Sequence, residues 1–163
     1  MPSRRPSRAA PSSAVGKVEE GAARVRVEVS PALPQAHADE TALRHALVNL
    51  LVNAVKYGVD PDKEGSPIVI EVSEQPDKGE MQLSVRDDGP GIDPADLAHV
   101  FEPFYRGRTA GTVPGSGLGL NLVKKMMEGQ KGRVSVHSKT GQGTTFTLHI
   151  KTVRRSSEPK DDR

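Results

Sequence analysis

A strict alternation of apolar and polar residues on both sides of one short turn constrains the fold more than any other feature. Residues 68–72 and 81–85 alternate in this way, and the sequence QPDKGE lies between them. Period-two alternation buries one face of a strand, and two such runs around a Pro- and Gly-containing turn predict an antiparallel hairpin. The inward residues are Ile68, Ile70, Val72, Met81, Leu83 and Val85. The chain therefore contains a sheet with one buried face.

The alternation also aims a carboxylate at the interior. Asp87 has the parity of Leu83 and Val85, and burying a charge is costly unless it finds a partner. The sequence continues as DDGPGI, where Gly89 and Gly91 permit a sharp turn and a close approach of the backbone. Two interpretations are equally open on these residues alone. Asp87 either accepts hydrogen bonds from a ligand, such as an exocyclic amine, or caps a turn before a helix.

Residues from about Glu40 to Tyr57 predict an amphipathic helix. Asp39 is a good N-cap, and Gly58 is expected to end the helix in the left-handed conformation. The apolar stripe contains Leu43, Leu47, Leu50, Leu51 and Ala54. A helical wheel places a polar set on the opposite face, namely His45, Asn49, Asn53 and Lys56, with Tyr57 at its edge. Asparagine is a poor helix-interior residue, so two of them in one helix need an explanation. This face is either an ordinary solvated surface or a ligand site.

The remaining segments complete a two-layer architecture. Asp93-Pro94 starts a short helix to about Val100, residues 102–117 form a long loop, and a helix follows from about Leu118 to Glu128. Further strands are expected at residues 25–29, 133–138 and 144–151. About five strands and three helices predict an α/β (α+β) two-layer sandwich, with a mixed, mostly antiparallel sheet covered on one face by helices.

Composition defines the ends of the domain. Residues 1–21 are rich in Ser, Pro, Ala and Arg, so we interpret them as a disordered linker or a cloning-derived tail. Residues 154–163 are interpreted as a second disordered tail, which leaves 22–153 as the folded domain. The chain has no cysteine, no apolar run of membrane length and no signal peptide, so we expect a cytoplasmic domain whose parent protein could be membrane-anchored.

Charge and aromatic content argue against two classes of partner. The net charge is +2, and the chain has three Phe, two Tyr and no Trp, which argues against nucleic-acid binding. We also expect no contact of this domain with a membrane.

Two glycine-rich segments are weak signals taken singly. GSGLGL at 115–120 opens a helix, where free N–H groups and the helix dipole favour phosphate. It is neither a Rossmann fingerprint nor a Walker A motif, and the alternative is a simple loop closure. GQGTTF at 141–146 alone indicates a hairpin turn with glycines at positive φ.

In this order, however, the segments resemble the ATP-binding domain of sensor histidine kinases. That family belongs to a superfamily with DNA gyrase, heat-shock chaperones and mismatch-repair ATPases, which share the Bergerat fold. The matching motifs are HALVNLLVNAVKYG, DDGPGI, FEPFYRG, GSGLGL and GQGTTF, and the resemblance covers about residues 22–152. It implies an α/β sandwich with a long ATP lid, which agrees with the architecture predicted above.

The resemblance implies a phosphate and metal side of the site. Asn53 would give its amide oxygen to Mg²⁺, and Asn49 would act through the metal shell or its waters. Lys56 would approach a phosphate, and Arg106 would reach the γ-phosphate, with Arg108 as a weaker candidate. The expected catalytic set is thus Asn49, Asn53, Lys56 and Arg106.

It also implies an adenine side. Tyr57 would pack on the adenine, Asp87 would accept from its amino group, Gly91 would support nearby water or backbone contacts, and Thr144 would line the floor. Phe101, Phe104 and Tyr105 would root residues 102–117 as the lid. The other expected nucleotide-binding residues are Gly89, Ile92, Phe104, Gly115, Gly117, Leu118, Gly119 and Leu120.

The function implied is transfer of the ATP γ-phosphoryl to a histidine on a separate dimerisation and phospho-acceptor domain, with a response regulator downstream. ATP-hydrolysing members of the superfamily carry a glutamate at the position of Asn49, and asparagine cannot act as a base. The chain departs from the family in having GQKG at 129–132, and none of its five histidines has the sequence context of a phospho-acceptor. Two alternatives remain: a free-standing ATP-binding regulator or serine kinase of the anti-sigma-factor type, and a nucleotide-free scaffold.

Overall fold

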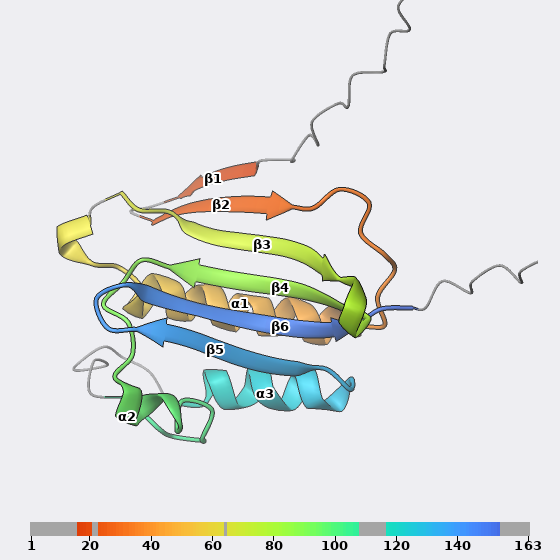
Figure 1. Ribbon diagram of the computed structural model, residues 1–163. Coiled ribbons are helices and arrows are strands. Elements are labelled where there is room, and N and C mark those ends of the chain that lie inside the picture. Colours follow the sequence, from red (N-terminus) through yellow and green to blue (C-terminus); the bar gives the residue numbers. More distant parts are fainter. Residues whose placement is uncertain (1–15, 21–22, 64, 108–116, 154–163) are drawn as a thin grey trace, which may run out of the picture.

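The computed structural model describes residues 16–20, 23–63, 65–107 and 117–153, which form one six-stranded sheet with helices packed on it (Figure 1). The strands are β1 (Gly16–Glu20), β2 (Ala23–Val29), β3 (Ile68–Gln75), β4 (Glu80–Asp87), β5 (Arg133–Lys139) and β6 (Gly143–Lys151). The helices are α1 (Glu40–Tyr57), α2 (Pro94–Leu97) and α3 (Gly119–Gly129), with 3-10 turns η1 (Pro61–Lys63) and η2 (Pro76–Lys78).

The sheet is mixed and mostly antiparallel, as predicted. Its strand order is β1-β2-β3-β4-β6-β5, and β2–β3 is the one parallel pair within the described residues. In the predicted hairpin, Ile70 faces Val85 and Val72 faces Leu83 across the β3–β4 pair. The turn between them is η2, followed by Gly79 in the left-handed conformation. The alternation therefore predicted the correct strands and the residues that face the core.

The sixth strand corrects the prediction of about five strands and a disordered segment over residues 1–21. Residues 16–20 pair with β2 as an edge strand, while residues 1–15 and 154–163, also predicted to be tails, lie outside the described residues. The segment GKVEE has one apolar residue, so periodicity cannot detect it. An edge strand forms through backbone hydrogen bonds, which any non-proline sequence supplies.

The core lies between α1, α3 and the inner face of the sheet. Figure 1 shows α1 behind the sheet and α3 alongside β5. The buried apolar residues of these elements include Ala46, Leu50, Ala54, Leu83, Val85, Val123, Met127, Phe146, Leu148 and Ile150. Asn49 and Asn53 are only half-buried, so the two faces that the wheel separates are distinct in the structure.

Two helix boundaries differ from the predictions. Gly58 ends α1 with φ −92° and not in the left-handed conformation. The reason for glycine is space, since a Cβ there would lie 2.5 Å from the Asp87 side chain. α2 ends at Leu97 and not near Val100, because His99 and Glu102 donate to carbonyls three residues back, a bond pattern that tightens the chain into 3-10 turns.

The sheet face that points away from the helices carries a polar cluster at the beginning of β4. Glu80 is 6% exposed and accepts from Arg133 at 2.8 Å, with Lys151 Nζ at 3.5 Å. His149 is also 6% exposed, and its Nδ1 lies 3.5 Å from the Glu80 carboxylate. The Ser135 hydroxyl lies 2.8 Å from His149 Nε2. These contacts satisfy an otherwise costly pair of buried polar groups.

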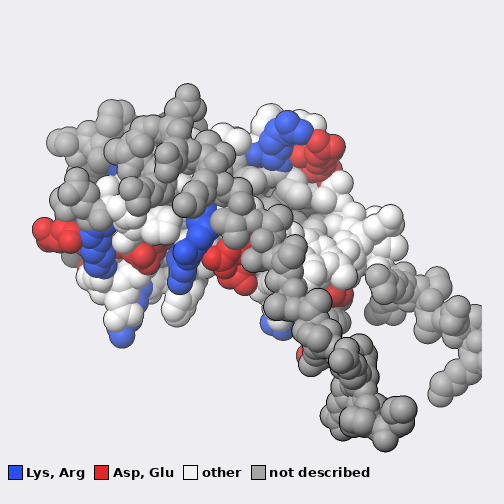
Figure 2. Space-filling model, turned by 90° about the horizontal axis from the view of Figure 1, so that it is seen from above, with Lys and Arg blue, Asp and Glu red and all other residues white. Residues whose placement is uncertain are grey.

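Charges elsewhere are mixed in sign. Figure 2 shows blue and red side chains interspersed on the face seen from above, without one large patch of either sign.

Candidate functional site

A cavity of about 280 Å³ lies at the end of the molecule where β4 ends and β6 begins. Its walls come from α1, α2, the start of α3 and the strand ends. Most of the residues predicted from the sequence line it, although they come from segments far apart in the chain. They are Asn49, Asn53, Lys56, Tyr57, Asp87, Gly91, Ile92, Arg106, Gly117, Gly119, Leu120 and Thr144.

Three predicted residues do not line the cavity. Gly89 is buried behind it, Leu118 is 39% exposed, and Phe104 is 72% exposed. Phe104 was expected to help root the loop, but its side chain is exposed to solvent and its backbone makes the contact. The Phe104 N–H donates to the Gly117 carbonyl at 3.0 Å. Gly115 and Arg108, which were also predicted, lie outside the described residues.

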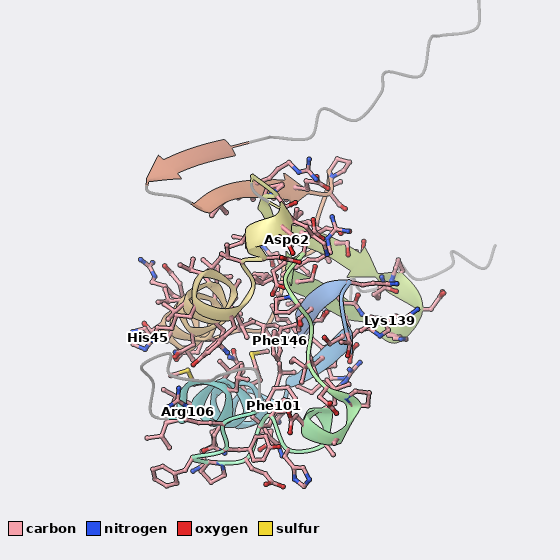
Figure 3. The ribbon with its side chains drawn as sticks, turned by 90° about the vertical axis from the view of Figure 1, so that its left-hand side faces the viewer. His45, Asp62, Phe101, Arg106, Lys139 and Phe146 are labelled. Atoms are coloured by element: carbon pink, nitrogen blue, oxygen red, sulfur yellow. The ribbon has the colours of Figure 1, made fainter. Side chains whose placement is uncertain are left out.

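Phe101, which was predicted to root the loop together with Phe104 and Tyr105, has its ring packed against the core. Its ring packs edge-on against Phe146 of β6, with centroids 6.2 Å apart. Figure 3 shows Phe146 at the centre of the molecule, with Phe101 and Arg106 on the side of α2 and α3. The Phe101 carbonyl also accepts from Asn121 of α3 at 3.0 Å. This pairing anchors the chain shortly before residues 105–107, which line the cavity.

The two asparagines of α1 present amide groups to the cavity. The Asn49 side-chain nitrogen donates to the His45 carbonyl one turn earlier, at 2.9 Å. This bond fixes the amide so that Oδ1 points toward the start of α3, where a Cβ on Gly119 would lie only 3.1 Å from it. Glycine at position 119 therefore keeps space open next to a neutral oxygen donor. Figure 3 shows His45 at the outer edge of α1, and His45 does not line the cavity.

Asp87 is a buried carboxylate of the sheet that faces the cavity, at 8% exposed. Its Oδ1 accepts from the N–H groups of Gly89 at 3.0 Å and Thr144 at 3.3 Å. In the described part of the chain no cation lies within 4 Å of it, and both of these hydrogen bonds end on Oδ1, which leaves Oδ2 for a further donor. Burial raises the pKa of Asp87, while those two N–H groups lower it and Asp88 raises it. An acceptor held in this way suits a neutral or weakly polar hydrogen-bond donor.

Bare backbone surrounds Asp87. A Cβ on Gly89 would lie 2.6 Å from the Gly58 Cα, and a Cβ on Gly143 would lie 2.0 Å from the Asp87 carbonyl oxygen. Gly143 also has φ +93°, a backbone conformation that residues other than glycine rarely adopt. The glycines of three predicted motifs thus meet at one corner and bring the ends of α1, β4 and β6 into contact.

The first residues of α3 border the other side of the cavity. Gly117 has φ +72° and packs against the Phe104 backbone, and Gly119 begins the helix. The first N–H groups of a helix have no partners within it, so this end can bind an anion. The cavity wall therefore combines a helix N-terminus, two amides and a lysine with carboxylates and apolar residues.

The sequence alone did not indicate several residues of the cavity. They are Val52, Ala54, Asp96, Val100, Gly107 and Phe146, together with Tyr105, whose predicted place was at the root of the loop. Phe146 could have been found, because it shares the parity of Thr144 and Leu148. Lys63 was also missed: its Nζ donates to the carbonyls of Gly141 at 2.8 Å and Asp88 at 3.3 Å, which joins two of the glycine turns.

Two curated bacterial sensor proteins are similar in sequence to this chain. The phosphate regulon sensor protein PhoR of Pseudomonas aeruginosa is 38% identical over 129 residues, covering 78% of this chain and 28% of PhoR. The sensor-like histidine kinase SenX3 of Mycobacterium tuberculosis is 40% identical over 114 residues, covering 69% of this chain and 26% of SenX3. The chain thus spans about a quarter of the length of these curated relatives.

Two solved structures are similar to this chain in both fold and sequence. Full-length ShkA in complex with AMPPNP superposes with a TM-score of 0.65 at 34% identity, over 80% of this chain and 26% of ShkA. The mycobacterial sensor histidine kinase MprB has a TM-score of 0.65 at 31% identity, over 79% of this chain and 84% of the MprB chain. None of the described helices combines the length and apolarity that a bilayer crossing requires.

A family model described as "Histidine kinase-, DNA gyrase B-, and HSP90-like ATPase" matches residues 38–154, which include every element around the cavity. The chain therefore belongs to the family of histidine kinase-, DNA gyrase B- and HSP90-like ATPases.

Proposed function

We propose that this chain is the Mg-ATP-binding catalytic domain of a two-component sensor histidine kinase. It would transfer the γ-phosphoryl group of ATP to a histidine on a separate dimerisation and phospho-acceptor domain, from which a response regulator would receive it. The domain would work in the cytoplasm. The observation that carries the proposal is the cavity itself, which joins Asp87, the asparagines of α1 and the start of α3.

The adenine is assigned to the Asp87 end. Asp87 Oδ2 is available to an exocyclic amino group, and the ring would lie beside Tyr57, Ile92 and Phe146. A carboxylate that accepts a hydrogen bond from the base gives a preference for adenine over bases that present a carbonyl there. Thr144, on the floor, and Gly91 are positioned to contribute further polar contacts.

The phosphates and Mg²⁺ are assigned to the α1–α3 end. Asn53 would hold the ion with its amide oxygen, and Asn49 would do so directly or through water. Magnesium prefers oxygen ligands and takes several of them from phosphates and water, so neutral amide oxygens fit it. The oriented Asn49 oxygen and the space beside Gly119 support this assignment. The ion would offset phosphate charge, while Lys56, Arg106 and the α3 N-terminus would orient the chain of phosphates.

Asparagine at position 49 supports transfer to a protein nucleophile. An amide cannot take a proton from water, and phosphoryl transfer depends mainly on positioning and charge stabilisation. PhoR and SenX3 are named as sensors, which favours this function over the anti-sigma-factor alternative. ShkA, with which this chain superposes, was solved with an ATP analogue.

Calorimetry with ADP and a non-hydrolysable ATP analogue, with and without MgCl2, tests the proposal. We expect Asn53→Ala to weaken Mg-dependent binding by about tenfold, the equivalent of one metal-ligand interaction, and to change metal-free binding less. His45→Ala is the control, because His45 lies on the same helix outside the cavity. Absence of binding by the unmodified chain at millimolar nucleotide would contradict the proposal. Equal losses with and without Mg²⁺ would remove Asn53 from the metal site.

A further inference from the structure

Asp96 is a second buried carboxylate in the wall of the cavity, and the chemistry proposed above does not use it. It lies in α2, is 4% exposed and lines the same cavity as Asp87. A buried carboxylate is costly unless it organises donors around it. What Asp96 contacts therefore indicates what it contributes.

The residues on both sides of Arg106 meet the two oxygens of Asp96. The Tyr105 hydroxyl donates to Oδ1. On the other side, a Cβ on Gly107 would lie 3.1 Å from Oδ2, so the backbone at position 107 passes directly beside that oxygen. The Asp96 carboxylate thus lies close to the residues on both sides of Arg106. Arg106, between them, lines the cavity.

Asp96 is itself held by the sheet. Its short helix is capped by Asp93, whose side chain accepts from the Ala95 N–H at 2.8 Å. Just before this cap, the Ile92 N–H donates to the Ser138 hydroxyl of β5 at 2.8 Å. A Cβ on Gly91 would lie 2.4 Å from the Lys139 carbonyl oxygen, so the chain is packed tightly against β5 there. Asp96 therefore has a fixed position relative to the sheet.

We propose that Asp96 and Tyr105 are positioning residues that hold Arg106 for the terminal phosphate of a bound nucleoside triphosphate. This inference rests on the proposed function. The hydrogen bond from Tyr105 and the closeness of Gly107 to Asp96 hold the backbone on both sides of Arg106, so that its side chain starts from a fixed backbone when the ligand binds. Neither Asp96 nor Tyr105 needs to touch the nucleotide for this effect.

The inference predicts selective loss of affinity. Tyr105→Phe keeps the ring and removes the hydroxyl, and we expect it to weaken binding of a non-hydrolysable ATP analogue by about tenfold, the equivalent of one hydrogen bond to a charged group. Binding of ADP, which lacks the terminal phosphate, should change by less than about twofold. Asp96→Ala should give the same selectivity, and Asp96→Asn, which retains an acceptor oxygen, should be milder.

A double-mutant cycle separates positioning from general damage. If Tyr105 acts through Arg106, Tyr105→Phe should have no further effect once Arg106→Gln is present, because the loss is already complete. Glu102→Gln is the matched control: it alters a nearby exposed pair, in which Glu102 lies 2.9 Å from His99, and it leaves Asp96 untouched. We expect it to change neither affinity. Thermal unfolding of each variant checks that it is folded.

The outcomes are distinct. Equal loss of ADP and triphosphate affinity in Tyr105→Phe, or additive losses in the cycle, would overturn the inference while leaving the proposed function intact. Unchanged affinities in both Tyr105→Phe and Asp96→Ala would overturn it as well. If the unmodified chain bound neither nucleotide, the proposed function would fail and this inference with it.

Discussion

The two ends of β4 each bury a carboxylate, and the surroundings of the two differ in kind. At its beginning, Glu80 lies among Arg133, Lys151 and His149 on the face away from the helices. At its end, Asp87 faces the cavity with two N–H groups on one oxygen and no cation within 4 Å among the described residues. Both are less than a tenth exposed, so burial alone does not distinguish them.

The pKa values of the two groups move in opposite directions. Burial would raise the pKa of Glu80, but Arg133, Lys151 and His149 together hold it below its usual value of 4.5. For Asp87 burial prevails and raises the pKa above its usual value of 3.8. A carboxylate saturated by cations stabilises the fold, whereas one left short of partners is available for a ligand. The same isosteric substitution at the two positions therefore separates stability from binding.

The largest effect is expected at the cavity end. Asp87→Asn should weaken ADP binding by about 100-fold or more, because a charged acceptor becomes a neutral amide. Its free energy of unfolding at neutral pH should not fall, since the cost of burying a charge is removed. Calorimetry and urea unfolding measure the two quantities. Glu80→Gln is the matched control and should leave ADP affinity unchanged; a comparable loss of affinity in Glu80→Gln would break the comparison.

Adding one methyl group next to Asp87 should have the next largest effect. In Gly143→Ala the new Cβ would meet the Asp87 carbonyl oxygen at 2.0 Å, whereas in Gly141→Ala it would meet nothing within 4 Å. Both positions have positive φ, +93° and +78°, so both variants carry the conformational cost of about 1–2 kcal/mol. In urea unfolding, we expect Gly143→Ala to lower the free energy of unfolding by about 2–3 kcal/mol more than this shared cost. We also expect it to weaken ADP binding. Equal losses would show that the contact relaxes freely.

Removing the charge at the other end should cost stability. Glu80→Gln should lower the free energy of unfolding by about 1–3 kcal/mol at neutral pH, because Arg133, Lys151 and His149 lose their shared acceptor. Since the folded pKa of Glu80 lies below 4.5, its contribution is present above that value and is lost as the pH falls through the folded pKa. The stability difference between the two proteins should therefore shrink on acidification. A difference that is independent of pH would contradict the assignment.

Asp87 should give the opposite pH dependence. Because its folded pKa is raised, its neutral form is favoured in the folded state, and stability is lost as the pH rises from 3.8 through the folded pKa. The advantage of Asp87→Asn over the unmodified protein should therefore appear only on going to neutral pH. Urea unfolding at a series of pH values gives both curves, and curves of the same sign for the two positions would remove the contrast.

The smallest effect is expected at Arg133, whose side chain is 49% exposed. Arg133→Gln should cost no more than about 1 kcal/mol, because solvent screens the pair and Lys151 remains near Glu80. A sharper measurement is NMR titration of His149, whose pKa is lowered by burial first and by Arg133 second. Removing the guanidinium should raise that pKa. A value that stays constant would mean that Arg133 is too well solvated to affect the imidazole.

The sequence predicted much of the fold because apolar periodicity is a local property. Alternation located β2 to β6, and the stripe on α1 separated Leu50 and Ala54 from Asn49 and Asn53. It missed β1, which pairs through its backbone. The sequence predicted that glycine is needed at position 58 for a left-handed conformation. The structure shows that it is needed for space, because a Cβ there would meet the Asp87 side chain of β4. Contacts of this kind depend on the packing of distant segments, which local patterns do not encode.

The residues of the site also differ in whether they could be predicted from the sequence. The parity of Asp87 predicted its burial, and the family resemblance predicted most of the residues in the cavity wall. Asp96 could not be found this way, since its carboxylate acquires meaning only when Tyr105 and Gly107 pack around it. His149 was interpreted as ordinary packing, and the cluster with Glu80 requires the β4–β6 and β5–β6 registers.

The imbalance at Asp87 also links occupancy of the cavity to the proton content of the protein. An amino group that donates to Oδ2 favours the ionised carboxylate and so lowers its raised pKa. In mildly acidic solution, the protein would then release protons as it takes up its ligand. The heat measured on binding will therefore depend on the ionisation enthalpy of the buffer, and affinity will fall as the solution is acidified. In mildly acidic solution, the Asp87 carboxyl thus carries a proton that it loses when the ligand binds.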